Sequence, residues 1–167
     1  MQTRCNEGLR FCRNLDCKAL KQLVFISIGS NLDAEKNMNL AKYHLDLIFD
    51  VTYSGIYKTP AEGFVGGDFL NRVCKFETEV DPYEIRLMLK KIEHDMGRTN
   101  DQKGMSSRVI DLDLILYGDL KIDDHELEIP SSDIENYKFV LEPLAEIAPT
   151  SIHPILKKSY LELLNFL

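Results

Sequence analysis

One run of the sequence, from Arg108 to Tyr117, constrains the fold more than any other. It reads Arg-Val-Ile-Asp-Leu-Asp-Leu-Ile-Leu-Tyr, and this alternation of apolar and acidic residues is typical of a β-strand with one buried face. The apolar face is expected to carry Ile110, Leu112, Leu114 and Leu116. Asp111 and Asp113 then share the other face. Gly118-Asp119, directly after the strand, indicates a hairpin turn.

Two carboxylates in this arrangement indicate a cation site. With a rise of about 3.3 Å per residue, the α-carbons of Asp111 and Asp113 are expected roughly 6 to 7 Å apart, which suits one or two hard cations such as magnesium. Asp is depleted in strands and like charges on one face repel, so we prefer this interpretation to two ordinary solvent-facing residues. Three basic residues near the strand are placed to neutralise metal-bound phosphate oxygens, namely Arg98, Lys103 and Arg108.

Hydrophobic periodicity predicts six main elements. In chain order they are a buried strand over 23–28, an amphipathic helix built on Met38, Ala41, Leu45 and Ile48, a strand over 51–57, a half-buried strand over 69–80, a helix from Asp81-Pro82 to Gly97, and the strand over 109–117. The polar stretch 98–107 is expected to be a long mobile loop. Four prolines divide the rest of the chain into short pieces, with a last helix over 158–167.

The order strand, helix, strand, strand, helix, strand is that of a split β-α-β unit. We therefore expect an α+β fold, a ferredoxin-like αβα sandwich with an antiparallel sheet and a C-terminal extension. The 167 residues suffice for one domain with a hydrophobic core. Residues 1–22 show no clear period, so we expect an N-terminal extension there and a single domain at 23–167.

Composition narrows the range of partners. Lys plus Arg total 20 against 27 for Asp plus Glu, a net charge of -7, which argues against a nucleic-acid or anionic-membrane surface and favours a small ligand. No apolar run reaches the roughly 18 residues of a membrane span, and no secretory signal is recognisable. The four cysteines lack the paired spacing of a zinc site, so we expect reduced thiols in a cytoplasmic protein.

A second pair of residues suits a flat heterocycle. Phe69 and Asn71 fall on one face of their strand, and they combine an aromatic platform with an amide that donates and accepts hydrogen bonds. An edge-strand Phe beside a solvated Asn explains the same residues equally well. The sequence contains no Walker loop, GxGxxG run or protein-kinase signature. Its four histidines are scattered singly, as expected of surface or core residues.

Several motifs follow one another between residues 23 and 160. They are Phe25-Ile26-Ser27-Ile28-Gly29-Ser30-Asn31-Leu32, Tyr57-Lys58-Thr59-Pro60, Phe69-Leu70-Asn71, Ile92-Glu93 with Gly97-Arg98, Arg108 with Asp111-Leu112-Asp113-Leu114, and Pro143-Leu144-Ala145-Glu146-Ile147-Ala148-Pro149. With these motifs the chain resembles the 6-hydroxymethyl-7,8-dihydropterin pyrophosphokinase family of folate biosynthesis. The last two motifs are specific when they occur together.

The resemblance implies an enzyme, a diphosphotransferase that moves the diphosphate of ATP to the hydroxymethyl oxygen of a reduced pterin and releases AMP. It implies two magnesium ions on Asp111 and Asp113, and Arg98 and Arg108 as catalytic residues that hold and release the phosphates. The residues it implies for pterin binding are Thr59, Pro60, Glu62, Phe69, Asn71 and Phe139, with the two phenylalanines sandwiching the ring. Those it implies for ATP are Glu93, Arg108 and Leu114.

The chain departs from the family pattern at five positions. Asn100 replaces a second loop arginine, Met105 an aromatic residue, Ser131 a histidine, Ser132 an aromatic residue and Tyr137 an arginine. Each change weakens nucleotide binding rather than pterin binding, because a charged hydrogen bond to phosphate is worth about 1.5 to 3 kcal/mol.

Alternatives to the active transferase therefore stay open. One is a divergent paralogue that binds a pterin without efficient transfer, and another is an enzyme that acts on a related pterin. A bare ferredoxin-like interaction module leaves the aspartate pair unexplained. The expected partners are ATP and a reduced pterin, the expected state is a monomer, and neither nucleic acid nor a membrane is expected to bind.

Overall fold

The computed structural model describes residues 20–63, 65–99 and 106–167. Its main sheet is antiparallel and consists of β1 (Gln22–Ser30), β2 (Thr52–Tyr53), β3 (Tyr57–Thr59), β4 (Phe69–Thr78) and β5 (Asp111–Tyr117). β1 lies between β4 and β5, while β2 and β3 both pair with β4. The α+β class expected from the sequence is confirmed, and so is a buried central strand at 23–28.

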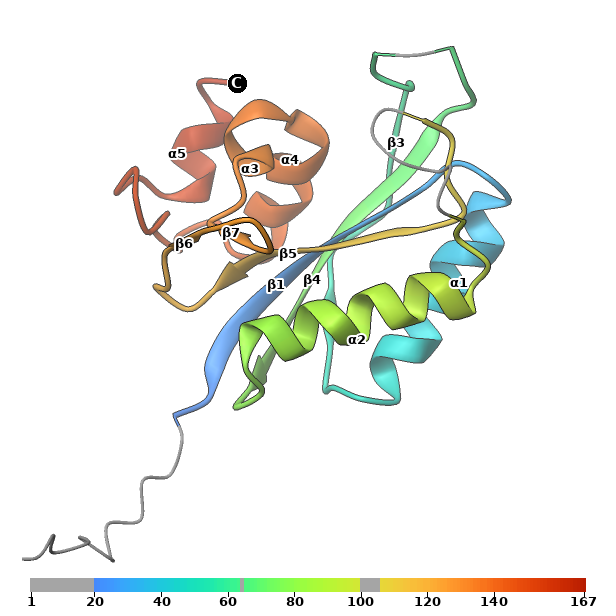
Figure 1. Ribbon diagram of the computed structural model, residues 1–167. Helices are drawn as coiled ribbons and strands as arrows, with labels where there is room; N and C mark the ends of the chain where they lie inside the picture. The colour runs from blue at the N-terminus through green and yellow to red at the C-terminus, as the bar shows by residue number, and fades with distance from the viewer. Residues whose placement is uncertain (1–19, 64, 100–105) are drawn as a thin grey trace, which may run out of the picture.

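Helices cover both faces of this sheet (Figure 1). α1 (Ala34–Asp46) and α2 (Pro82–Asp95) pack on one face, and α3 (Asp133–Asn136), α4 (Lys138–Ile147) and α5 (Tyr160–Leu164) pack on the other. A small second sheet, formed by β6 (Ile122–Asp123) and β7 (Glu128–Ile129), follows β5.

Each face carries its own apolar cluster, because side chains alternate along the strands. The larger cluster lies under α1 and α2 and includes Ile26, Met38, Leu45, Ile85 and Leu112. The smaller cluster lies under α4 and α5 and includes Phe25, Val73, Ile115, Leu144 and Tyr160. Farther along the same face, the strands carry polar residues in place of this second cluster.

α2 begins and ends at the residues that the sequence predicts. The Asp81 side chain accepts a hydrogen bond from the backbone N–H of Tyr83 at 2.9 Å, and Pro82 occupies the first helical position. Gly97, just after the helix, has a φ of +93°, a conformation that favours glycine. The expected apolar stripe is buried at Ile85, Leu89 and Ile92.

β5 departs from the predicted alternation near its end. Leu112 and Leu114 lie on the α1–α2 face as expected, but Leu116 belongs to the opposite cluster. The register with β1 shifts between Phe25 and Ile26, which pair with Leu116 and Leu114, so Ile115 is an extra residue on β5. A bulge of this kind reverses the alternation beyond it. The expectation that Leu116 shares the face of Leu112 is therefore wrong.

α4 was not expected, because Pro143 lies inside it and prolines usually mark helix ends. A cluster of apolar side chains holds this helix against the sheet, namely Val140, Leu141, Leu144 and Ala145, and their burial offsets the hydrogen bond that the proline removes. Because α4 packs on β4, Val73 and Asn71 are buried. The prediction that residues 69–80 form a half-buried strand is wrong on this point.

Two further strand predictions are wrong. The strand expected over 51–57 is divided into β2 and β3, because the N–H of Gly55 donates to Glu146 of α4 instead of joining the sheet. The hairpin expected after Tyr117 does not form, since β6 pairs with β7. The N–H of Ser131 bonds the carbonyl of Ile115 at 2.9 Å and so occupies the free edge of β5.

Two predicted helices are shorter than expected. α1 ends at Asp46, so Ile48 lies beyond it and is exposed. The last helix, expected over 158–167, is α5, which Ser159 and Glu162 begin with a reciprocal capping box.

Several predictions fall on residues outside the described ranges. They concern residues 1–19 of the extension expected at 1–22, most of the loop at 98–107, the departures Asn100 and Met105, and three of the four cysteines. The remaining cysteine, Cys74, is a free and buried thiol, and burial raises its pKa to about 12. Within the described ranges, no helix has both the length and the apolar character needed to cross a membrane.

Candidate active site

A cavity of about 250 Å³ lies on the face of the sheet that α4 covers only in part. Strand residues contribute Ser27, Gly29, Phe69, Asn71, Asp111 and Asp113, and loop and helix residues contribute Thr59, Pro60, Glu62, Arg108, Asp133, Tyr137, Phe139 and Val140. The structure thus brings together every residue implied for pterin binding, both aspartates and Arg108.

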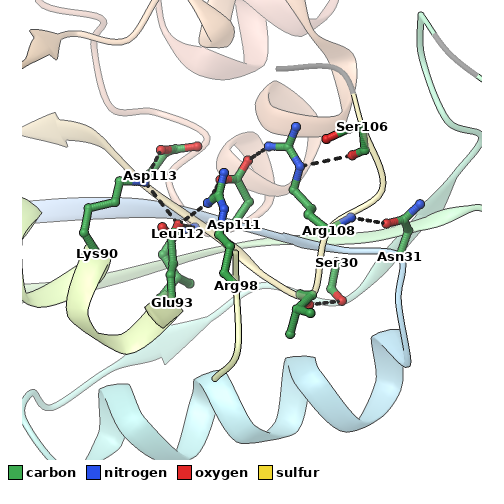
Figure 2. A network of polar contacts seen from close by, with 11 residues as sticks. Ser30, Asn31, Lys90, Glu93, Arg98, Ser106, Arg108, Asp111, Leu112 and Asp113 are labelled. Carbon is green, nitrogen blue, oxygen red and sulfur yellow. Dashed lines mark hydrogen bonds and ion pairs between the residues drawn. The ribbon is translucent and has the colours of Figure 1, made fainter. Parts of the chain in front are cut away.

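Asp111 and Asp113 lie side by side on β5 (Figure 2). Asp111 forms ion pairs with Arg98 and Arg108, whose side chains are only 16% and 14% exposed. Asp113 is paired with Lys90 of α2, with Nζ 3.4 Å from Oδ1. Arg98 and Arg108 stand on either side of residues 99–107 in the sequence, and both pair with the same carboxylate.

Glu93 lies behind the aspartates and is buried, with 3% exposure. Its Oε1 accepts hydrogen bonds from the backbone N–H of Leu112 at 2.6 Å and from Arg98 at 2.6 Å. Lys90 donates to the same oxygen at 3.1 Å. Glu93 therefore holds the side chains of Arg98 and Lys90 in place beside the aspartate pair (Figure 2).

The turn after β1 anchors the start of β5. Asn31 accepts a hydrogen bond from the backbone N–H of Arg108 at 2.8 Å and donates to Ser107 Oγ at 3.1 Å. Ser30 donates to the carbonyl of Val109 at 2.6 Å. These contacts explain why the Gly-Ser-Asn turn and the Arg-x-x-Asp-Leu-Asp motif occur together, because one positions the other (Figure 2).

The electrostatics of the pair favour a bound cation. Burial, together with the negative charges of Asp111 and Glu93, raises the pKa of Asp113 to about 6, while Lys90 acts in the opposite direction. For Arg98, burial lowers the pKa, but Asp111 and Glu93 outweigh it and the pKa is raised above its ordinary value. The pKa of Asp113 stays raised because Lys90 compensates only part of the effect of burial and of the neighbouring carboxylates.

The other end of the cavity is shaped for a flat ligand. Asn71 is buried, and its Nδ2 donates to Thr59 Oγ1 at 2.8 Å, which fixes the orientation of the amide. A Cβ at Gly29 would lie 3.1 Å from Asn71 Oδ1, so glycine leaves this amide its space. Phe69 of β4 and Phe139 of α4 line the same cavity from different elements.

A second cavity of about 220 Å³ adjoins the first and shares Asp113 and Asp133 with it. Leu114, which the resemblance implies for ATP, lines it together with Lys90 and Ser131. Its charged lining is mostly acidic, with Asp113, Glu126, Glu128 and Asp133 against Arg86 and Lys90. Glu93 and Arg98, which the resemblance implies for ATP and the phosphates, line neither cavity.

The donor set fits magnesium. Mg²⁺ prefers carboxylate oxygens and is commonly bound by one or two carboxylates together with water and substrate phosphates. Asp111 and Asp113 supply two such ligands, and in the described residues no cluster of three or more acidic, His or Cys side chains completes a site by itself.

Sequence reasoning missed Lys90 and Asp133. Lys90 precedes Glu93 by three residues on α2, a spacing that places both on one helix face, and this spacing was a usable signal. Asp133 lies at the start of α3, and burial, followed by the charges of Glu128 and Asp111, raises its pKa. Nothing in the sequence links Asp133 to β5.

Comparison with known proteins places the chain in a class of phosphate-transferring enzymes. The family model described as 7,8-dihydro-6-hydroxymethylpterin-pyrophosphokinase matches residues 25–149. The chain belongs to this family, and the expectation of an enzyme that transfers pyrophosphate is confirmed.

Named relatives agree with this assignment. The chain is 36% identical over 138 residues to the 2-amino-4-hydroxy-6-hydroxymethyldihydropteridine pyrophosphokinase of Aquifex aeolicus, covering 81% of this chain and 86% of that protein. It is 37% identical over 137 residues to the folic acid synthesis protein FOL1 of Dictyostelium discoideum, covering 80% of this chain but only 21% of that longer protein.

Solved structures agree on the fold. The Plasmodium falciparum HPPK-DHPS A437G structure with pteroate superposes with a TM-score of 0.71 at 14% identity, covering 90% of this chain and 44% of that one. The chain therefore has the fold of a domain that also occurs inside a larger polypeptide.

Proposed function

We propose that this protein transfers the diphosphate of ATP to the hydroxymethyl group of 6-hydroxymethyl-7,8-dihydropterin, with magnesium, in folate synthesis. The products are the pterin diphosphate and AMP. The observation that carries the proposal is the first cavity, which joins Phe69, Asn71 and Phe139 to Asp111 and Asp113 in one continuous space.

The apolar end of this cavity suits the pterin. Phe69 and Phe139 offer aromatic faces on which a flat heterocycle stacks. Asn71, held by Thr59, presents its carbonyl oxygen to donor groups at the edge of the ring. The segment from Thr59 to Glu62 completes the wall on this side.

The charged end suits the phosphates. The second cavity, with Leu114 and Lys90, is the proposed position of the nucleoside part of ATP. Arg98 and Arg108 are placed to bind phosphate oxygens once Asp111 is engaged by the cation. Magnesium bound at Asp111 and Asp113 supplies neutralisation of the phosphate charge.

The reaction requires no protein nucleophile. The hydroxymethyl oxygen forms a bond to the β-phosphorus of ATP, the bond from that phosphorus to the bridging oxygen of AMP breaks, and the hydroxyl proton passes to solvent. The residues of the chain position the two substrates and balance the charge, which is what phosphoryl-type transfer chiefly needs.

The test is AMP production from ATP and the dihydropterin. Asp111→Ala and Asp113→Ala are expected to abolish magnesium-dependent AMP release, a loss of at least about a hundredfold. Asp123→Ala, which removes an exposed carboxylate of β6, is the matched control and is expected to retain activity. Unchanged turnover in both active-site variants contradicts the proposal.

A second candidate is a paralogue that binds a pterin without efficient transfer. The acidic lining of the second cavity favours it, because carboxylates at Glu126, Glu128 and Asp133 repel a polyanionic nucleotide. Tight pterin binding with no AMP at saturating ATP supports this candidate, and robust turnover excludes it. Turnover with a different reduced pterin identifies the third alternative, a related substrate.

The proposal also includes the finer structural expectations. The strand order β2-β4-β1-β5, with helices after β1 and β4, supports the ferredoxin-like arrangement. A single domain at 23–167, an extension at 1–22, two metal ions, a monomeric state and a cytoplasmic location remain predictions from the sequence.

A further inference from the structure

Tyr137 occupies a defined place beside the pterin end of the first cavity. It precedes α4 with an extended backbone, φ -128° and ψ 118°. Its carbonyl accepts hydrogen bonds from the N–H groups of Val140 and Leu141 at 3.0 and 3.1 Å. The backbone of Tyr137 is thus held by the first turn of the helix, and its side chain lines the cavity.

The Tyr137 ring is stacked with Phe139. The two ring centroids are 5.0 Å apart and the planes are inclined by 24°, which is the separation of an attractive offset pair. Phe139 lines the same cavity. The two residues therefore form one aromatic surface that is wider than Phe139 alone.

The hydroxyl of Tyr137 is available to a ligand. In the described part of the chain no hydrogen bond or ion pair involves this group. Tyr57, by contrast, donates its hydroxyl to Glu146 at 2.7 Å. A phenol hydroxyl that lines a cavity and has no partner within the protein is free to bond a ligand there.

We propose that Tyr137 is a specificity-determining residue for the pterin, a third aromatic contact that widens the Phe139 platform and donates its hydroxyl to an acceptor of the ligand. The inference rests on the proposed function, because it takes the first cavity to be the pterin site. Tyr137 lines the first cavity and is absent from the lining of the second. Its loss thus weakens pterin binding and leaves nucleotide binding unchanged.

The test measures binding of 6-hydroxymethylpterin to the full chain without nucleotide, by calorimetry. Tyr137→Leu removes the ring and is expected to weaken binding about fivefold to tenfold, the size of one aromatic contact. Tyr137→Phe keeps the ring and is expected to lose about threefold, because only the hydrogen bond is removed. Tyr43→Leu, at an exposed site on α1, is the control and is expected to bind as the unaltered protein does.

A second readout separates ligand contact from a packing role. The chain contains no tryptophan, so Tyr137→Trp introduces a single indole whose fluorescence is expected to be quenched strongly by the bound pterin. Tyr43→Trp is expected to be quenched less. In assays of turnover, Tyr137→Leu is expected to raise KM for the pterin and not for ATP.

Several outcomes overturn the inference. Unchanged or tighter pterin binding by a folded Tyr137→Leu variant does so, since tighter binding means that the ring obstructs the cavity. Absence of quenching in Tyr137→Trp also does so, even where the leucine variant fails to fold. Failure of the unaltered chain to bind a pterin, both alone and with magnesium and a non-hydrolysable ATP analogue present, contradicts the proposed function instead, so the two failures are distinguishable.

Discussion

The two faces of the main sheet are built from the same strands and have opposite characters. Under α1 and α2 the face carries a large buried apolar cluster that includes Ile26, Ile28 and Leu112. On the other face, α4 and α5 cover the strands only near Phe25, Val73 and Ile115. The strands continue past these helices with polar residues, and there the cavity lies.

This difference shows that one strand can contribute side chains both to the hydrophobic core and to the cavity. Along β5, Leu112 packs under the helices while its neighbours Asp111 and Asp113 face the cavity. A period of two residues is enough to separate the roles. What makes one face a site is incomplete helical cover, which leaves room for a ligand and keeps carboxylates within reach of water.

The largest expected effect is a difference in stability between variants at two adjacent residues of β5, one on each face of the sheet. Leu112→Ala is expected to lower the free energy of unfolding by about 2 to 5 kcal/mol, because it leaves a cavity under α2. Asp113→Asn is expected to leave stability unchanged or higher, since it removes one of two neighbouring like charges. Urea unfolding of both variants measures the contrast. Equal destabilisation by the two variants would show that the cavity face contributes as much to stability as the buried face.

The next effect compares two neighbouring lysines of α2. Lys90 faces the aspartates through Glu93 and Asp113, whereas Lys91 pairs with Asp95 and is 73% exposed. Lys90→Gln is expected to weaken binding of magnesium-ATP about tenfold, close to 1.4 kcal/mol, because one cation is lost beside the phosphates.

Lys91→Gln is the matched control, and it is expected to bind magnesium-ATP as the unaltered protein does. Calorimetric titration of a non-hydrolysable ATP analogue with magnesium measures both variants. A similar loss in the two lysine variants would mean that the effect is one of net charge rather than of position. Rescue by Lys90→Arg would support a charge contact.

A smaller effect tests the contact between α4 and the edge of the sheet at β3. Glu146 of α4 accepts hydrogen bonds from the Gly55 N–H at 3.0 Å and from the Tyr57 hydroxyl at 2.7 Å. The bond to Glu146, the largest cause, raises the pKa of Tyr57 to about 12.

Glu146→Gln is expected to cost about 1 kcal/mol of unfolding free energy, a modest value because these groups are partly exposed. It is also expected to raise KM for the pterin, since Tyr57 belongs to β3, which leads into Thr59 and Pro60. Glu142→Gln, one turn earlier on the same helix, is the control. Thermal unfolding and a KM measurement for both variants show whether Glu146 positions the wall.

The smallest effect is a pH dependence of the free energy of unfolding, caused by a buried histidine. His153 is buried, and its Nδ1 accepts hydrogen bonds from the N–H groups of Ile155 and Leu156. Burial lowers the pKa of His153, with Lys157 acting the same way and Glu135 opposing it.

The unfolded state therefore takes up the proton first as the pH falls. Stability is expected to be fully present above the unfolded pKa of about 6.5 and to decrease as the pH falls through the lower, folded value. Urea midpoints between pH 8 and 5 measure the slope, and His153→Gln is expected to flatten it. An equal slope in that variant assigns the effect to other groups, and His125→Gln, at an exposed histidine, serves as the control.

Local patterns predicted much of the fold. The strands at 23–28 and 109–117, the capped helix after Asp81 and the paired faces of Phe69 with Asn71 all follow from periodicity and capping, which act over a few residues. The errors have non-local causes. Pro143 is tolerated because α4 packs on the sheet, Leu116 is displaced by a bulge opposite Phe25, and Ser131 takes the edge where a hairpin was expected.

The sequence by itself determined that Asp111 and Asp113 share one face of β5, because strand alternation places them together. The tertiary structure decided what surrounds them. Lys90 and Glu93 approach from α2, and Asp133 and Tyr137 approach from segments that are distant in the chain. Spacing along a strand is a property of the backbone, whereas the meeting of separate elements depends on how whole faces pack and on which part of a face the helices leave open.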